Sequence, residues 1–285
     1  MSDLAKFNST ITNVRTQEYL TQVLGEKKNA FVNNVTALVA NNKALQECEP
    51  LSIMYAATKA TALDLPLDQN LGFAYVIPFK NNKENKTEAT FMLGYRGLVQ
   101  LAMRSGQFKT INVRDVREGE IVGEDFLSGE LQFQKLQDEE REKAKVVGYV
   151  AYFRLINGFE KMSYWTVQEL KNHGLRYSQT YASKNDWVRK NSKWETDFDA
   201  MAKKTVLKLL LSKYAPLSVD MQYAIKYDQA VIGENDSVKY VDNNSQANIN
   251  EAQQEAAANR FAEAFKSADN VEDAQVVNTE TGELF

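Results

Sequence analysis

The stretch that decides the fold is WETDFDAMAKKTVLKLLLSKY, residues 194–214, where lysines interrupt an otherwise largely apolar helix. At about 100° per residue, Val206 and Leu210 fall on one side, and Lys204 and Lys208 fall on the other beside further leucines. A solvated face seldom sets leucines beside its charges, so we expect the lysine side to be covered too. Few acidic residues lie nearby to pair with covered lysines, and a phosphate would fit. The alternative is a core helix whose lysines reach water along their stems.

A second basic face is predicted in GYRGLVQLAMRSGQFK, residues 94–109, which reads as a helix after a strand. Arg96 and Arg104 share one face of this helix, and Tyr95 and Phe108 flank it. Single-stranded nucleic acid is bound through aromatic rings that stack on bases and cations that neutralise phosphates. The pattern is therefore compatible with nucleic-acid binding, although basic faces with nearby aromatics are common.

A third segment, GLRYSQTYASKNDWVRKNSKW, residues 174–194, leads directly into the lysine helix. Its composition suits the lining of a strand-binding groove, and the alternative is a surface loop held by its aromatics. The aromatic residues Tyr177, Tyr181, Trp187 and Trp194 interleave with the basic residues Arg176, Lys184, Arg189, Lys190 and Lys193.

Taken together, the order of segments resembles the RecT family of phage-type single-strand annealing recombinases. The resemblance runs through PLSIMYAATKATALDLPLD (50–68), GFAYVIPF (72–79), LGYRGLVQLAMRSGQ (93–107) and MAKKTVLKLLLSKYAPLS (201–218), and covers residues 20 to 230. It implies an ATP-independent DNA recombinase that binds single-stranded DNA and anneals complementary strands. It also implies a homo-oligomer, as a ring or helical filament, that stabilises the annealed duplex in the cytoplasm of a bacterial host cell, associated with the nucleoid during phage replication.

The resemblance implies DNA contacts along a continuous basic groove. We expect Lys204 and Lys208 to bind DNA rather than to stabilise the core. Reversing both charges should therefore abolish DNA binding and leave the fold intact. The DNA-binding residues predicted in this way are Lys80, Tyr95, Arg96, Arg104, Gln107, Lys109, Lys193, Trp194, Lys203, Lys204 and Lys208.

Catalytic chemistry is not predicted. The sequence contains neither G-x-x-x-x-G-K-[ST] nor G-x-G-x-x-G, so an ATP motor is not supported. One histidine, His173, and one cysteine, Cys48, leave no His-rich or Cys-rich metal site and make a Ser-His-Asp triad improbable. We therefore expect no cofactor, no metal and no enzymatic activity.

Three alternatives remain open at this stage. Asp64 with Asp68, or Asp197 with Asp199, could hold Mg²⁺ in a nuclease, but acids at such spacings usually cap or solvate helices. A passive single-strand-binding protein would carry the same basic and aromatic groove. A structural phage assembly protein could place its lysines at subunit contacts.

The charge is divided unevenly along the chain. Of 285 residues with a net charge of −4, residues 234–285 hold eleven Asp or Glu and three Lys or Arg, which leaves residues 1–233 at +4. We expect residues 1–233 to form the DNA-binding, annealing and oligomerisation core. Residues 234–285 are predicted to be a flexible acidic linker with a short helix that binds a phage exonuclease or the host single-strand-binding protein. No signal peptide or membrane span is evident, so export and membrane insertion are not expected.

The predicted fold is α+β, with helices packed on a small antiparallel sheet with hairpins and the lysine-bearing helix near the end of the core. Helices are predicted at 17–41, broken near Gly25, at 50–66, from Thr166 and at 219–231. The charged segment DEEREKAK, 138–145, is predicted to be a solvated loop. Strands are predicted at 71–79, 89–93, 110–116, 121–133, 146–155 and 159–165, with polar 80–88 as a mobile hairpin tip and Asn157-Gly158 as a turn.

Overall fold

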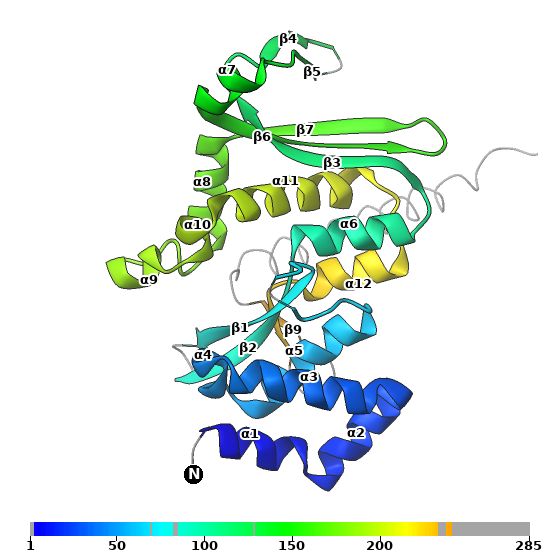
Figure 1. Ribbon diagram of the computed structural model, residues 1–285, viewed down its shortest axis with the longest axis vertical. Coiled ribbons are helices and arrows are strands. Elements are labelled where there is room, and N and C mark those ends of the chain that lie inside the picture. The colour runs from blue at the N-terminus through cyan, green and yellow to red at the C-terminus, as the bar shows by residue number, and fades with distance from the viewer. Residues whose placement is uncertain (1–2, 69, 82–84, 128, 233–237, 241–285) are drawn as a thin grey trace, which may run out of the picture. The chain divides into compact units, whose positions relative to one another are not determined.

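The computed structural model describes residues 3–68, 70–81, 85–127, 129–232 and 238–240 (Figure 1). Residues 1–242 form one compact unit and residues 243–285 a second. All of the described elements belong to the first unit, whose last strand, β9 (Val238–Tyr240), lies beyond the predicted core boundary at residue 233. The predicted tail helix at 251–268 lies outside the described residues.

Helices dominate the first part of the chain: α1 (Asp3–Ile11), α2 (Val14–Leu24), α3 (Lys28–Ala40), α4 (Lys43–Gln46) and α5 (Pro50–Ala62). The predicted break near Gly25 is confirmed, because Gly25 has a φ of 52° and a 3₁₀ turn, Gly25–Lys27, separates α2 from α3. Pro50 begins α5, where its missing N–H and fixed φ suit the first turn. The helix ends before Asp64, which has a φ of 53°.

The first sheet has four strands in the order β1-β2-β8-β9. The predicted pair is confirmed as β1 (Ala74–Asn81) and β2 (Lys86–Leu93), which are antiparallel with Val76 opposite Phe91. Pairing extends into the segment predicted as a hairpin tip, since Lys80 lies opposite Thr87. Helix α5 packs on β1, β2 and β8 (Ala230–Ile232), and buries Ile53, Ala57 and Ala60 in the core.

The second sheet has three antiparallel strands in the order β3-β6-β7: β3 (Phe108–Arg117), β6 (Val146–Leu155) and β7 (Glu160–Thr166). The predicted alternation of β6 is confirmed, since Tyr149, Ala151, Phe153 and Leu155 are all buried. The Asn157-Gly158 turn follows, and Gly158 has a φ of 91°. Helix α8 (Val167–Tyr177) then begins with a capping box between Thr166 and Glu169.

The prediction of a loop at 138–145 is wrong, because Asp138–Lys143 form helix α7. Acidic residues occupy its first turn and basic residues its last, which favours a helix through its dipole. Arg141 then fixes the helix, donating to Glu120 Oε1 at 2.8 Å and to Asp115 Oδ2 at 3.0 Å. The adjacent two-stranded hairpin is β4 (Ile121–Asp125) and β5 (Glu130–Phe133).

The lysine helix, α11 (Phe198–Tyr214), packs on the β3-β6-β7 sheet and on α6 (Tyr95–Arg104). Short helices α9 (Asp186–Lys190) and α10 (Lys193–Thr196) precede it, and α12 (Val219–Tyr227) follows. The helices thus pack between and beside small antiparallel sheets, which confirms the α+β fold (Figure 1).

The predicted helix 219–231 is wrong at its end. Helix α12 stops at Tyr227, Asp228 is buried, and Gln229 has a φ of 63°. The Gln229 N–H donates to Phe91 O at 2.8 Å, so the chain joins the first sheet as strand β8. In the part of the chain that the structure describes, no helix is long and apolar enough to cross a membrane.

Candidate nucleic-acid interface

A groove of about 530 Å³ lies between the first sheet and the start of the lysine helix. One wall comes from β1 and β2, with Tyr75, Ile77 and Pro78 among its apolar and aromatic side chains. The other wall comes from α10 and α11. Tyr95, Lys193 and Lys204, three of the predicted DNA-binding residues, line this groove together.

Two glycines bring the first turn of α6 against the segment before β1. A Cβ on Gly94 would lie 2.0 Å from the Gly72 carbonyl oxygen, and one on Gly97 would lie 2.2 Å from the Phe73 carbonyl oxygen. The Gly94 N–H donates to Phe73 O at 2.9 Å across this contact. Any larger side chain would push the two backbones apart, so the glycines of LGYRG determine where Tyr95 lies.

Tyr95 and Arg96 stand together at the start of α6. The Arg96 guanidinium donates to Tyr95 Oη at 3.4 Å and to Leu71 O at 3.3 Å, and its side chain remains exposed. Tyr75 lies beside them. Burial raises the pKa of Tyr75, with a further contribution from Asp197, while Arg96 acts in the opposite direction. The Tyr75 phenol therefore stays neutral, and Asp197 offsets part of the positive charge of the groove.

Lys204 and Lys208 of the lysine helix both bind the buried carboxylate of Asp228. Lys204 Nζ donates to Asp228 Oδ1 at 2.9 Å, and Lys208 Nζ donates to Asp228 Oδ2 at 2.7 Å. The Leu93 N–H also donates to Asp228 Oδ1, at 2.9 Å. Burial alone would raise the pKa of Asp228, but the two ammonium groups outweigh it and lower the pKa to about 2.

The expectation that Lys204 and Lys208 lack an acidic partner is therefore wrong. The Lys204 side chain is 7% exposed and its ammonium is held by Asp228, while Lys208 is 27% exposed. The partner follows these lysines by 24 and 20 positions in the sequence, on the far side of α12. In this arrangement the lysines join α11 to the first sheet, and their combined charge with Asp228 is +1.

Trp194 belongs to an aromatic cluster rather than to a surface. Its indole is 5% exposed and packs against Tyr181, with ring centroids 6.0 Å apart, and against Phe198 at 5.9 Å. His173 packs at 6.2 Å from the same indole. Burial lowers the pKa of His173 to about 4, with Lys208 and Arg176 contributing, so the imidazole is neutral at physiological pH.

The exposed tryptophan of this region is Trp187, on α9. Its side chain is 74% exposed, whereas Tyr181 and Trp194 of the same segment are buried. Arg189 and Lys190 share its short helix, and Lys184 and Lys193 lie on either side of it in the sequence. The groove prediction for residues 174–194 thus divides into a buried aromatic cluster and an exposed, basic tip.

Two further predicted residues have hydrogen-bond partners within the chain. Arg104 donates to Leu63 O at 2.7 Å and to Asp64 O at 2.9 Å, and so binds the carbonyl groups that follow α5. Lys203 donates to Asp199 Oδ2 at 2.7 Å, one turn away on α11. Asp64 is also paired with Lys27 at 3.1 Å, so one acid of each pair considered as an alternative Mg²⁺ site already binds a lysine.

The remaining predicted residues are all exposed. Lys80 lies on β1, Gln107 immediately precedes β3, and Lys109 lies at the start of β3.

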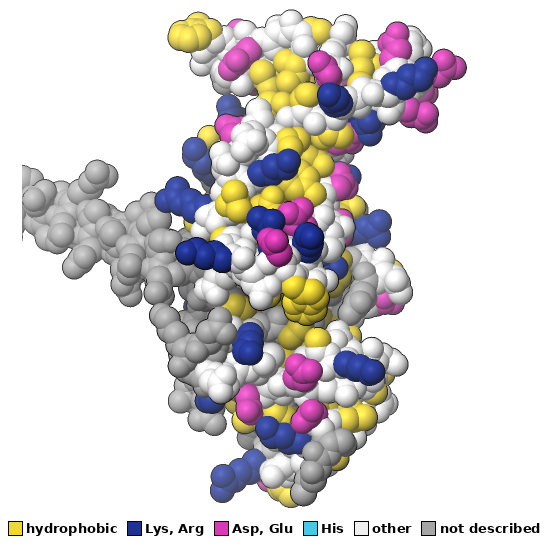
Figure 2. All heavy atoms as spheres, turned by 90° about the vertical axis from the view of Figure 1, so that its left-hand side faces the viewer, with side chains coloured by type: hydrophobic (Ala, Val, Ile, Leu, Met, Phe, Trp, Pro, Cys, Tyr) yellow, Lys and Arg dark blue, Asp and Glu magenta, His cyan; other side chains and the backbone are white. Residues whose placement is uncertain are grey.

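Figure 2 shows the side of the molecule on which α9 projects in Figure 1. Lys and Arg side chains there are interspersed with hydrophobic side chains and with Asp and Glu.

Two contributors, Tyr75 and Asp228, were missed by sequence reasoning, and Asp197, which lines the groove, was considered only as a possible Mg²⁺ ligand. Tyr75 lies in the quoted segment GFAYVIPF. The alternation of the strand places it on the other face from the buried Ala74 and Val76. Asp228 gave a weaker signal, an acid between Tyr227 and the apolar run Ala230–Ile232.

Comparison with known proteins identifies the family of this chain. The family model described as "RecT family" matches residues 29–251. The chain is 39% identical over 230 residues to "Uncharacterized protein YqaK" of Bacillus subtilis (strain 168), covering 81% of this chain and 72% of that protein. It is 31% identical over 201 residues to "Protein RecT" of Escherichia coli (strain K12), covering 70% of each. The groove, the glycines that shape it and the lysine helix all lie within residues 29–251, and the chain belongs to the RecT family of single-strand annealing recombination proteins.

Proposed function

We propose that this protein is an ATP-independent recombinase that binds single-stranded DNA and anneals it to a complementary strand. The observation that carries the proposal is the groove in which Tyr95 and Lys193 meet an apolar wall, with the exposed Arg96 bonded to Tyr95, in a chain of the RecT family. The lack of a phosphate-cradling motif in the sequence supports the independence from ATP. Base pairing itself supplies the free energy and the specificity, so the protein need only neutralise phosphates and leave base edges open.

We assign different roles to the predicted residues. Arg96 and Lys193 are proposed to bind phosphates, while Tyr95 and the exposed Trp187 are proposed to stack on bases. Lys80, Gln107 and Lys109, which are exposed, are proposed to extend the path of the strand. We propose that Lys204, Lys208, Arg104, Lys203 and Trp194 act mainly by holding the walls of the groove, because their functional groups already have partners or are buried.

The acidic C-terminal segment is proposed to bind protein partners. Residues 234–285 carry a net charge of −8, which would repel DNA from a basic groove. A phage exonuclease or the host single-strand-binding protein is the expected kind of partner. A chain ending after Asp242 should then anneal oligonucleotides in vitro and lose recombination activity in cells.

A salt titration tests the DNA-binding part of this proposal. The affinity for a labelled single-stranded oligonucleotide should fall linearly with the logarithm of salt concentration, with a slope of roughly −0.7 for each phosphate contact. An Arg96→Ala, Lys193→Ala variant should bind with a shallower slope. A flat salt response, or no binding, would favour the structural assembly protein instead.

A further inference from the structure

The β4–β5 hairpin presents two adjacent hydrophobic side chains to solvent. Phe126 and Leu127 are each 95% exposed, although both are large and apolar. The turn is held by local bonds: the Gly129 N–H donates to Asp125 O at 2.8 Å, and the Leu127 N–H donates to Asp125 Oδ1 at 3.0 Å. The pair is thus displayed on a structured tip, and adjacent exposed apolar side chains of this kind mark interaction sites.

The base of this hairpin is fixed to the second sheet. Glu120, which is 4% exposed, accepts the Arg117 N–H at 2.7 Å and the Arg141 Nε at 2.8 Å. An isolated two-stranded hairpin is marginally stable, and this network holds it in place. The tip therefore projects from a fixed position.

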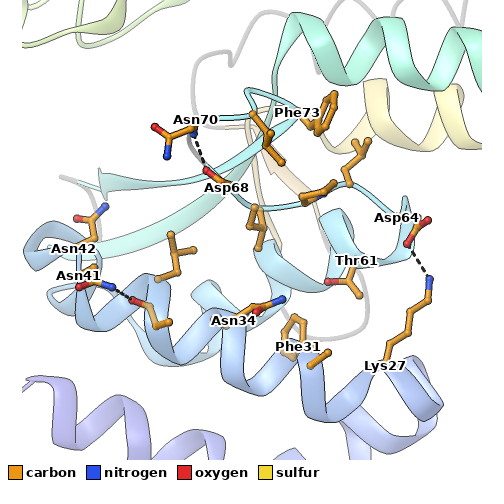
Figure 3. Close-up of a pocket in the computed structure, with 18 of the residues that line it drawn as sticks. Lys27, Phe31, Asn34, Asn41, Asn42, Thr61, Asp64, Asp68, Asn70 and Phe73 are labelled. Carbon is orange, nitrogen blue, oxygen red and sulfur yellow. Dashed lines mark hydrogen bonds and ion pairs between the residues drawn. The ribbon is translucent and has the colours of Figure 1, made fainter.

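A large groove with both apolar and polar lining residues lies elsewhere in the 1–242 unit, between α3, the segment 61–73 and the end of α6 (Figure 3). Its volume is about 1450 Å³, above the roughly 300–1,000 Å³ of small-molecule sites. Phe31, Leu38, Leu67 and Phe73 are among its apolar lining residues. Asn34, Asn42 and Asn70 add amide groups at its walls, which can both donate to and accept from a peptide backbone.

Two of the three cations of this groove have partners within the protein. Lys27 pairs with Asp64 at 3.1 Å, as Figure 3 shows, and Arg104 is bound to the carbonyl oxygens of Leu63 and Asp64. Asp68 adds a second carboxylate to the lining. With Asp64 and Asp68 in its lining, the groove suits a polypeptide segment better than a phosphate backbone.

The tip and the groove complement each other in charge as well as in apolar character. Residues 121–133 contain Glu124, Asp125 and Glu130 and no Lys or Arg, a net charge of −3. The groove lining holds Lys27, Lys43 and Arg104 against Asp64 and Asp68, a net charge of +1. Within the described part of the 1–242 unit, the hairpin and α3 lie towards opposite ends (Figure 1), so a tip reaches the groove of another molecule and not its own.

We propose that the Phe126–Leu127 tip of one molecule docks in the α3 groove of a second copy of this chain. The two surfaces differ, so the contact is heterologous, and each molecule keeps one free tip and one free groove after pairing. Repetition of such a contact closes into a ring or continues as a helical filament. The inference concerns contacts between copies of the chain and does not depend on DNA binding.

Cysteine cross-linking tests the contact, and the native thiol does not interfere. Cys48 is buried, and burial together with Glu47 and Glu88 raises its pKa to about 12. A Phe126→Cys variant is mixed with an Asn34→Cys variant under mild oxidation, with and without a single-stranded oligonucleotide. We expect a disulfide-linked dimer in the mixture at a yield well above that of either variant alone.

The control mixture combines Phe126→Cys with Val219→Cys, at a position that is 81% exposed and outside the groove. A yield no higher than this control under both conditions overturns the proposal. A dominant Phe126→Cys homodimer also overturns it, because that product shows tip-to-tip contact. Intact annealing beside either negative result would leave the proposed function standing.

Self-association of the full chain gives the second measurement. A Phe126→Ser, Leu127→Ser variant should associate about tenfold or more weakly by mass photometry or sedimentation, since buried apolar anchors dominate interfaces. Ile156→Ser, at an exposed position near the other hairpin turn, is the matched control and should associate like the wild type. Unchanged association of the tip variant contradicts the proposal.

Discussion

At the scale of single residues, Asp228 keeps a full negative charge in the core because two lysines surround it. Its side chain is 0% exposed, and both of its carboxylate oxygens accept from ammonium groups. A buried ion of this kind is tolerated only while its partners remain, since an unpaired buried charge is strongly destabilising. The ion pairs of Asp228 with Lys204 and Lys208 therefore hold α11 against the first sheet.

This arrangement reverses one expectation about the lysine stripe. A Lys204→Glu, Lys208→Glu variant would bring three carboxylates together, so we now expect it to unfold rather than to fold without binding DNA. Removing the acid alone, by Asp228→Ala, should lower the free energy of unfolding by about 3–5 kcal/mol. Urea denaturation measures this, with the exposed Lys213→Glu as control, expected within about 0.5 kcal/mol of the wild type. A small effect of Asp228→Ala on the free energy of unfolding would show that these ion pairs do not stabilise the fold.

Two tryptophans of one segment should separate stability from DNA binding. Trp194→Ala should lower the free energy of unfolding by about 3–5 kcal/mol, because it empties the aromatic cluster. Trp187→Ala should leave stability unchanged and weaken binding of single-stranded DNA by about 1–3 kcal/mol, because we propose that the exposed ring stacks on a base. Denaturation and fluorescence anisotropy measure the two effects. Wild-type affinity of Trp187→Ala would remove that residue from the site.

At the scale of elements, the approach of α6 to the segment before β1 depends on missing side chains. Gly97→Ala would place a Cβ against the Phe73 carbonyl oxygen, so the helix must shift and carry Tyr95 and Arg96 with it. We expect a loss of about 1–3 kcal/mol in unfolding free energy together with weaker DNA binding. Gly123→Ala is the control, since its Cβ would meet only the flexible Gln132 side chain. Equal behaviour of the two variants would show that the close approach is unimportant.

Helix α8 carries a histidine that should make stability depend on pH. Its pKa is near 6.5 when unfolded and about 4 when folded, so between these values the unfolded chain binds more protons. Stability attributable to His173 is therefore present above pH 6.5 and falls as the pH drops towards 4, by about 2–3 kcal/mol at pH 4.5. His173→Phe should lose this dependence in urea denaturation at pH 7 and 4.5. The same pH dependence in both proteins would place its origin in other groups.

Elements were predictable where local patterns determine them and not where distant contacts do. The alternation of β6, the Asn157-Gly158 turn and the Thr166 cap are local features, and the structure confirms them. Helix α7 was missed because its charged sequence is also typical of a loop, and its contacts to Asp115 and Glu120 lie far away in the sequence. Asp228 was missed for the same reason.

At the scale of the whole molecule, we propose that this chain anneals two complementary DNA strands without ATP. Family membership supports single-strand annealing, and the groove brings Tyr95 and Lys193, the proposed stacking and phosphate-binding groups, to one surface. A passive single-strand-binding protein would use the same groups but would hold strands apart. The two functions differ in what happens to a second, complementary strand.

The most direct measurement is therefore the annealing rate of two complementary labelled oligonucleotides, without nucleotide triphosphate. We predict that the full chain raises this rate well above that of the oligonucleotides alone, and that a Tyr95→Ala, Arg96→Ala variant with wild-type stability loses most of the increase. A protein that binds the first strand but leaves the rate unchanged or lower, or that requires ATP to raise it, would contradict the account.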